Sequence, residues 1–142
     1  MDFIVAKTCD EVLTAFSDLK DCFFYFNGDI KAFAEKVYNN GVCFICKLEN
    51  TAGLVAFYAN DHETYTAYIT SVLVDEKCRG MGIATKLVQK VESFCIANGF
   101  GRIKLEVRKD NLPAISLYKK LGYKIDSEKE ESIYMCKNLE VD

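Results

Sequence analysis

The residues with the clearest capacity for chemistry form a short basic loop that contains two glycines. Lys77 and Arg79 supply positive charge, Gly80 and Gly82 follow, and an amphipathic stretch begins directly afterwards. Glycine lets backbone N–H groups approach an anion closely, and the N-terminus of a helix carries partial positive charge. The combination predicts a binding site for a phosphate or pyrophosphate group.

Two common phosphate-binding folds do not fit this loop. No Gly-Lys-Ser/Thr sequence accompanies the glycines, which rules out a P-loop NTPase. The loop also follows three strands that look antiparallel, whereas a dinucleotide-binding loop follows the first strand of a βαβ unit and carries a third glycine. The glycines alone therefore leave the class of phosphate ligand open.

Three downstream residues have types suited to proton transfer or ligand binding. Glu106 lies on the polar face of an expected strand, between Lys104 and Arg108. Asn111 precedes an expected helix, and Tyr118 lies within that helix. Each residue also has a purely structural explanation, because Glu106 fits a surface ion pair, Asn111 fits a helix cap and Tyr118 fits a packed core position.

Cysteine and histidine do not form an obvious site. The seven cysteines are an odd, irregularly spaced set, typical of free thiols in a reducing cytoplasm. Cys43 and Cys46 form a single C-x-x-C, but residues at this spacing point to opposite faces of a strand. His62 lies in an expected turn. We therefore expect no metal and no cysteine acting as an acyl carrier.

The apolar pattern predicts alternating helices and strands. The expected helices cover 9–20, 29–38, 83–97 and 112–121. The expected strands cover 3–5, 42–48, 54–59, 64–74, 103–107, 123–126 and 132–137. The strands within 42–74 are separated only by turns, so they are expected to form an antiparallel meander.

Length and composition indicate one globular domain, residues 1–142. Of the 142 residues, 50% are apolar and 27% are charged. A chain of this size buries enough surface for a core without disulfides or metals. No run of 18 apolar residues occurs and the first residues do not resemble a secretory signal, so we expect a cytoplasmic protein that does not act on membranes.

Charge is distributed unevenly along the chain. Residues 77–124 carry 11 Lys/Arg and 3 Asp/Glu, a net of +8, whereas the rest carries 7 and 18, a net of −11. This pattern predicts one neighbourhood for phosphates and another for a cationic or amine-bearing partner, although it also fits ordinary solvated charge. Nucleic acid is not favoured, because the whole chain is acidic and lacks a basic stripe interleaved with aromatic residues.

Two stretches, in the same order along the chain, resemble successive motifs of the GNAT superfamily of acyl-CoA N-acyltransferases. Residues 74–84 resemble its pyrophosphate motif, Arg/Gln-x-x-Gly-x-Gly/Ala, and residues 105–123 resemble the motif that follows, from Leu-x-Val through Asn and Leu-Tyr to Gly-Phe. The resemblance is specific over 72–124 and limited to the order of elements elsewhere. It implies an α/β fold: a mixed, mostly antiparallel, twisted sheet of about seven strands with helices on both faces.

The resemblance also implies acetyl-CoA as co-substrate and a role for particular residues. It assigns the pantetheine arm to the backbone of Val72, Leu73 and Val74, with Asn111 beside it. It assigns the pyrophosphate to Arg79, Gly80, Met81, Gly82, Ile83, Ala84 and Thr85. It assigns Tyr118 the protonation of the departing CoA thiolate.

The base that accepts the amine proton is less obvious. Many GNAT members carry a Glu on the long strand before the loop. The only polar side chains in the stretch between Tyr65 and Val74 are those of Tyr, Thr and Ser. Glu106 resembles the proposed base of bacterial enzymes that acetylate protein N-terminal amines. Its neighbours Lys104 and Arg108 are expected to keep it ionised at neutral pH.

The sequence therefore predicts an N-acetyltransferase that passes an acetyl group directly to a primary amine. The acceptor is expected to be cationic, either a small molecule or a peptide N-terminus, and to lie against the acidic first two helices and the final hairpin. A monomer and a homodimer are both compatible. The alternative is a catalytically silent acyl-CoA-binding module on the same fold.

Overall fold

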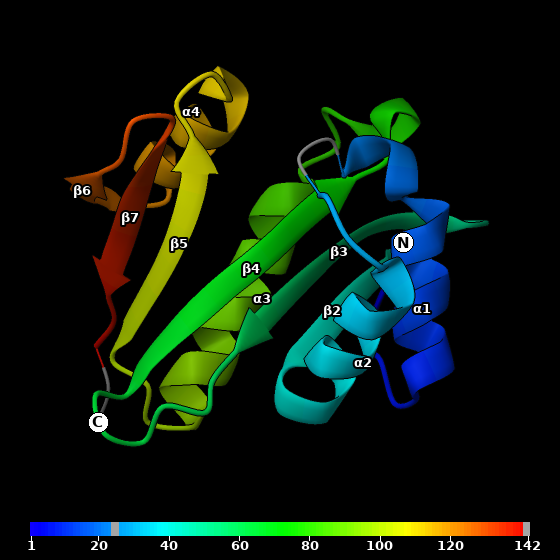
Figure 1. The fold of residues 1–142 in the computed structure, drawn as a ribbon, viewed down its shortest axis with the longest axis horizontal. Coiled ribbons are helices and arrows are strands. Elements are labelled where there is room, and N and C mark those ends of the chain that lie inside the picture. Colours follow the sequence, from blue (N-terminus) through cyan, green and yellow to red (C-terminus); the bar gives the residue numbers. More distant parts are fainter. Residues whose placement is uncertain (24–25, 141–142) are drawn as a thin grey trace.

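Figure 1 shows the fold of the computed structural model, which describes residues 1–23 and 26–140. The strands are β1 Asp2–Val5, β2 Val42–Lys47, β3 Thr51–Tyr58, β4 Thr66–Val74, β5 Arg102–Arg108, β6 Lys124–Glu128 and β7 Ser132–Asn138. The α-helices are α1 Cys9–Asp18, α2 Ile30–Asn40, α3 Ile83–Ala97 and α4 Leu112–Lys120. The short 3₁₀ turns are η1 Lys20–Cys22 and η2 Glu76–Cys78.

One mixed sheet of seven strands runs through the described chain, in the order β1-β2-β3-β4-β5-β7-β6. Its neighbouring strands are antiparallel except β4 and β5, which are parallel. A parallel pair needs a long crossover, and α3 supplies it between these two strands. The predicted meander and the predicted mixed α/β sheet are both confirmed.

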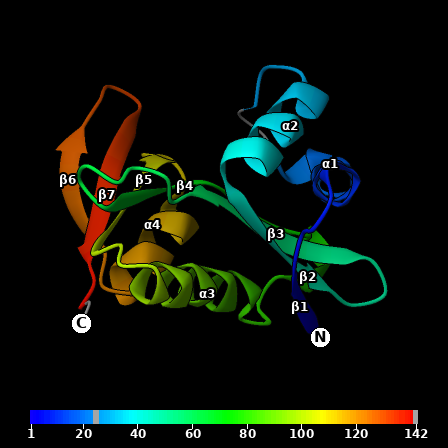
Figure 2. The same cartoon turned by 90° about the horizontal axis from the view of Figure 1, so that it is seen from below.

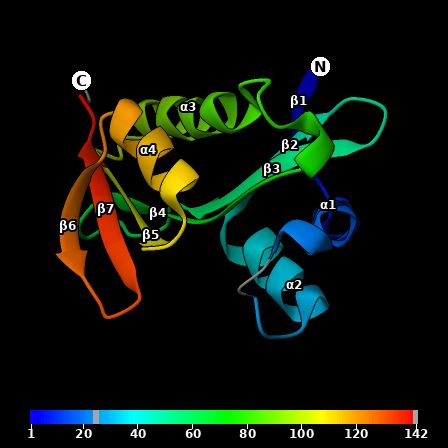
Figure 3. The same cartoon turned by 90° about the horizontal axis from the view of Figure 1, so that it is seen from above.

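Helices cover both faces of the sheet, as the views in Figure 2 and Figure 3 show. Helices α3 and α4 pack on one face, and α1 and α2 pack on the other. Each face has its own buried cluster: Leu87 and Val91 of α3 belong to the first, and Phe16 of α1 and Val37 of α2 belong to the second. Cys43 and Cys46 of β2 are divided between these two clusters, so the expected opposite orientation of the pair is confirmed.

A β-bulge in β4 exchanges the two faces part-way along the strand. Ala56 pairs with Ser71 and the next residue of β3 pairs with Ile69, so Thr70 is an extra residue on β4. Before the bulge, Ile69 packs into the α3 cluster. After it, Leu73 packs into the α1–α2 cluster. The bulge therefore turns the side chains at the end of β4 relative to those at its beginning.

The parallel strands β4 and β5 pair over only part of their length. The register joins Thr66–Ile69 to Arg102–Leu105 and then stops. Figure 1 shows the two strands diverging beyond this point, toward the end where α4 lies. The later residues of β4 keep their partners on β3, but the edge that faces β5 has no ladder partner there.

Local sequence signals explain the helix boundaries. Thr8 caps α1 by accepting from Glu11 N, Asp29 caps α2 by accepting from Lys31 N, and Asn111 caps α4 by accepting from Ala114 N. Residues Asn98 and Gly99 end α3, and Gly99 has the positive φ of a helix stop. Among the described residues, none of the helices is long and apolar enough to cross a membrane.

Candidate active site

The glycine loop leads into a helix whose first turn has no side-chain cap. Gly82 is the N-cap of α3, with φ 76°, and Gly80 has φ 83°. A Cβ at either position would meet no atom within 4 Å, so both glycines face open space. The other three α-helices have side-chain caps, whereas the first N–H groups of α3 have none. The loop therefore has room for an anion such as a pyrophosphate group at the start of α3.

A cavity of about 560 Å³ extends from this loop to α4. Val72, Leu73 and Val74 line one side of it, with their backbone paired to β3 and their other edge toward the diverging strand. An extended ligand with amide groups could form hydrogen bonds with the backbone at this edge, as an added β-strand does. The opposite side is formed by Asn111 and residues of α4. The arrangement fits the pantetheine arm of an acyl-CoA.

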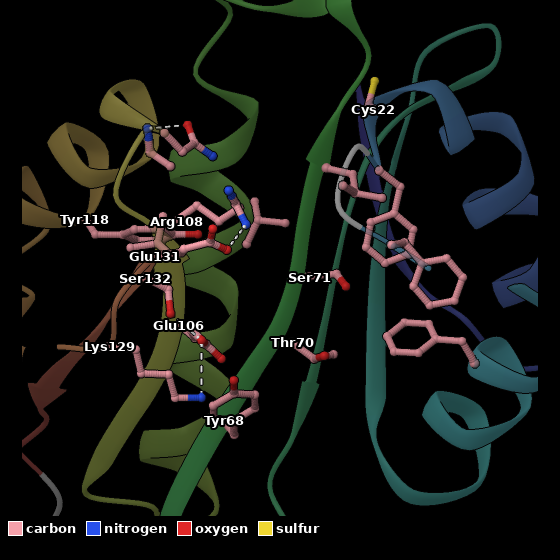
Figure 4. Close-up of a pocket in the computed structure, with 18 of the residues that line it drawn as sticks. Cys22, Tyr68, Thr70, Ser71, Glu106, Arg108, Tyr118, Lys129, Glu131 and Ser132 are labelled. Carbon is pink, nitrogen blue, oxygen red and sulfur yellow. Dashed lines mark hydrogen bonds and ion pairs between the residues drawn. The ribbon is translucent and has the colours of Figure 1, made fainter. Parts of the chain in front are cut away.

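A second cavity, of about 790 Å³, lies on the α1–α2 face of the sheet. Figure 4 shows it as the space between Glu106, Lys129 and Ser132 on one side and the segment that carries Cys22 on the other. Six residues line both cavities: Cys22, Val72, Leu73, Asn111, Ala114 and Tyr118. The two cavities therefore adjoin where β4 and β5 diverge, with α4 at the border.

Tyr118 is the phenol at this border. Its side chain is 7% exposed, and its ring lies edge-on to Tyr123 with centroids 5.7 Å apart. Burial raises the pKa of Tyr118 to about 12, because the charged tyrosinate is poorly solvated there. The side chain is therefore a protonated hydrogen-bond donor at neutral pH.

Glu106 lines the larger cavity from β5 and is held by the final hairpin. Ser132 donates a hydrogen bond of 2.5 Å to Glu106 Oε2, and Lys129 Nζ lies 3.5 Å from the same oxygen. The Ser132 hydrogen bond, aided by the Lys129 charge, holds the pKa of Glu106 below its ordinary value although partial burial opposes this. Glu106 is therefore a carboxylate at neutral pH.

The main groups that lower the pKa of Glu106 are Ser132 and Lys129 and not the two flanking residues that the sequence indicates. Lys104 forms an ion pair with Asp126, and Arg108 forms ion pairs with Asp110 and Glu131. Residues two apart on a strand are about 6.6 Å apart, so cross-strand neighbours reach a side chain more easily than flanking ones. The pairing of β5 with β7 brings the Ser132 hydroxyl to Glu106.

The expected wall of the larger cavity is only partly correct. The final hairpin contributes Glu130 and Glu131, as the acidic pattern predicts. The segment around η1 and α2 contributes Phe23, Phe26 and Phe33 instead of acidic side chains. The acidic residues of these helices face solvent, because the amphipathic pattern turns their apolar side toward the sheet.

Asn111 is placed for both roles that the sequence leaves as alternatives, the cap of a helix and a contact to the ligand. Its Oδ1 accepts a 3.3 Å hydrogen bond from Ala114 N, which caps α4. The same residue lines both cavities. The cap fixes the side chain at the border, so the structural explanation does not conflict with ligand contact.

Ser71 and Tyr68 are cavity residues that the sequence pattern does not single out. Ser71 is 6% exposed, and its hydroxyl has no hydrogen-bond partner within the described structure. Buried hydroxyls are usually paired, so this one marks a position where a ligand or water fits. Burial, and to a lesser extent Glu106, raises the pKa of Tyr68. The bulge at Thr70, which decides which β4 residues face this cavity, leaves no signal in the sequence.

Metal-binding clusters of three or more His, Cys, Asp or Glu side chains are absent from the described residues. His62 lies outside both cavities and packs against Tyr65 and Phe100, with ring centroids 5.7 and 5.5 Å apart.

Known proteins resemble this chain in sequence and in fold. The sequence model of the acetyltransferase (GNAT) family matches residues 12–123. The chain belongs to the GNAT family. The match includes α2, the bulged strand β4, the loop and α4, which all contribute to the two cavities, whereas residues 129–132 of the larger cavity lie beyond it.

Curated relatives match less than half of this chain. The mycothiol acetyltransferase of Corynebacterium jeikeium is 37% identical over 60 residues, which are 42% of this chain and 17% of that protein. An acetyltransferase of Yersinia enterocolitica is 38% identical over 64 residues, which are 45% of this chain and 43% of that protein. The matches thus span less than half the length of these relatives.

Solved GNAT-fold structures match almost the whole chain. The ribosomal-protein-S18-alanine N-acetyltransferase of Escherichia coli has a TM-score of 0.81, with 18% identity, over 99% of this chain and 96% of that chain. PaiA N-acetyltransferase of Thermoplasma acidophilum, solved with coenzyme A, has a TM-score of 0.77, with 16% identity, over 97% of this chain and 99% of that one. At these identities the likeness concerns the fold alone.

Proposed function

We propose that this GNAT protein transfers the acetyl group of acetyl-CoA directly to the primary amine of a small molecule or a peptide. The observation that carries the proposal is the position of Tyr118, which lines both cavities where they adjoin. A thioester in the smaller cavity and an amine in the larger one would meet beside its hydroxyl. Membership of the GNAT family supports the same reaction.

The donor half of the site holds acetyl-CoA, which supplies the activated thioester. The edge of β4 at Val72, Leu73 and Val74 aligns the pantetheine arm, and Asn111 contacts it from the start of α4. The first turn of α3 and the loop before it bind the pyrophosphate through Arg79, Gly80, Met81, Gly82, Ile83, Ala84 and Thr85. The uncapped N-terminus of α3 favours this negative group.

Transfer requires one new bond and two proton movements. The amine nitrogen attacks the thioester carbon while N–H groups near Leu73 and Val74 polarise the carbonyl oxygen. The C–S bond breaks, and Tyr118 gives its phenolic proton to the departing sulfur. The proton lost by the amine returns to Tyr118 through Glu106 and solvent, so the products are the N-acetyl amine and CoA.

Glu106 acts in this scheme as a carboxylate that receives the amine proton, directly or through water. Its lowered pKa makes it a weak base, so it guides the proton rather than deprotonating a stable ammonium ion. The larger cavity is lined by three carboxylates, Glu106, Glu130 and Glu131, and by two cations, Arg108 and Lys129. This balance favours a cationic acceptor, which loses its proton before attack.

The test is the release of free CoA thiol from acetyl-CoA in the presence of a panel of small amines and N-terminal peptides. We expect at least one primary amine to accelerate thiol release and to gain one acetyl group for each thiol formed. The alternative, a silent acyl-CoA-binding module, predicts tight binding of acetyl-CoA by calorimetry with thiol release no faster than in the absence of an amine.

A further inference from the structure

The larger cavity has a wall of aromatic rings opposite its charged wall. Phe23 and Phe26 are stacked, with centroids 4.6 Å apart and planes 3° from parallel. The ring centroid of Phe33, on α2, lies 5.3 Å from that of Phe26. All three phenylalanines are half-buried and line the cavity. This aromatic wall, Phe23, Phe26 and Phe33, thus presents apolar surface to the ligand space.

The aromatic wall is anchored from behind. Phe16 of α1 is fully buried, and its ring lies 5.7 Å from Phe23 and 5.3 Å, edge-on, from Phe33. Packing against a buried ring fixes the outer rings and lowers the conformational entropy that a ligand would otherwise have to remove. The wall is therefore a preformed surface.

The opposite wall fixes where the reacting nitrogen must lie. Tyr118 borders the smaller cavity, where the acetyl donor is proposed to bind. Glu106 lines the larger cavity from β5. Figure 4 shows Thr70 and Ser71 of β4 between Glu106 and the segment that carries Cys22. An amine placed beside Tyr118 and Glu106 therefore leaves the aromatic wall to contact the remainder of the acceptor.

We propose that the acceptor is an amine with an apolar, aromatic body that packs on Phe23, Phe26 and Phe33 while its nitrogen lies at Glu106 and Tyr118. This inference rests on the proposed acetyl transfer and narrows its substrate class. A cavity of about 790 Å³ has room for a ring and a short alkyl chain. The same chemistry occurs in free arylalkylamines and in a peptide that begins with phenylalanine.

The test compares two amines that differ by one ring, 2-phenylethylamine and ethylamine, as acceptors for the full chain. We expect kcat/KM to favour 2-phenylethylamine by roughly tenfold or more, since even one methylene in an apolar pocket changes it by about that factor. The Phe26→Ala variant should lose most of this preference through a higher KM. Phe33→Leu serves as a second variant that keeps apolar volume in the helix and should lower the preference in the same direction.

Phe94→Ala is the matched control. Phe94 is also a half-buried phenylalanine in an aromatic cluster, with Phe57 at 5.3 Å, but it lies on α3 across the sheet. Its truncation should leave the ratio of the two kcat/KM values unchanged. Thermal melting checks that each variant is folded.

Peptides that begin with Phe or with Ser distinguish the two sources of the acceptor. A Phe-first preference that weakens in Phe26→Ala, without turnover of free 2-phenylethylamine, assigns the aromatic body to a peptide. Two results would overturn the inference but not acetyl transfer. One is an equal kcat/KM for 2-phenylethylamine and ethylamine together with no preference for the peptide that begins with Phe. The other is an aromatic preference that the folded Phe26→Ala and Phe33→Leu variants both retain. Failure of every amine and peptide despite bound acetyl-CoA would overturn the proposed function, and the acceptor class with it.

Discussion

The surroundings of Tyr118 and Glu106 give these two side chains opposite protonation states at neutral pH. Tyr118 is almost fully buried, and desolvation keeps its proton in place. The side chain of Glu106 is 32% exposed and accepts a hydrogen bond from Ser132, which keeps it ionised. One group is thus a donor and the other an acceptor at neutral pH, as general acid–base catalysis requires.

The Tyr118→Phe variant should keep its affinity for CoA and lose turnover by about 10²-fold, because general acid catalysis contributes about that much. The loss should shrink with an acyl donor whose thiol is more acidic, since such a thiolate departs without a proton. Tyr123→Phe is the control, because this neighbouring ring lines neither cavity and its hydroxyl donates to Glu92 at 2.9 Å. Equal turnover for Tyr118→Phe and the wild type, with chemistry rate-limiting, would leave Tyr118 a packing residue.

The pH dependence of kcat/KM should follow the acceptor and not the enzyme. The pKa of Glu106 is lowered and that of Tyr118 is raised to about 12, so neither titrates between about pH 6 and pH 9. The rate should rise with pH as free amine is formed, and the inflection should move when an acceptor with a less basic amine is used. An inflection at the same pH for both acceptors would assign the titration to a protein group and contradict this account.

At the scale of elements, the loop between β4 and α3 is the proposed pyrophosphate site. Gly82 and Gly99 stand at the two ends of α3, and both have positive φ and open space where a Cβ would lie. A Val at either position should lower the free energy of unfolding by about 1–2 kcal/mol, because side chains disfavour this backbone conformation.

The Gly82→Val and Gly99→Val variants therefore form a matched pair. Both carry the backbone strain, but only Gly82→Val places methyl groups where the pyrophosphate is proposed to bind. Calorimetry should give a CoA affinity that is at least about tenfold weaker in Gly82→Val, and an unchanged affinity in Gly99→Val. Equal affinities in the two folded variants would remove the loop from the binding site.

Elements and sites differ in how far the sequence predicts them. Periodicity locates the helices and strands, because the amphipathic pattern of α3 and the alternation in β5 reflect burial directly. The bulge at Thr70 is not visible, since β4 alternates between half-buried and buried residues on both sides of it. The partner of Glu106 is also hidden, because Ser132 reaches it only through the β5–β7 register.

At the scale of the whole molecule, one sheet joins two cores and two cavities. The α3 side contributes the loop and the smaller cavity, and the α1–α2 side contributes the aromatic wall of the larger cavity. The divergence of β4 from β5 connects them. In the proposed reaction both substrates are therefore bound at once, and the acetyl group passes to the amine without an acyl-enzyme.

The central claim is that the amine attacks acetyl-CoA directly while both are bound. The alternative nucleophile at the border is Cys22, a free cysteine that lines both cavities. Initial rates measured while both substrates are varied decide between the two routes. Direct attack predicts double-reciprocal plots that intersect, because a ternary complex must form. Parallel lines, the pattern of a ping-pong reaction through an acetylated Cys22, would contradict the account.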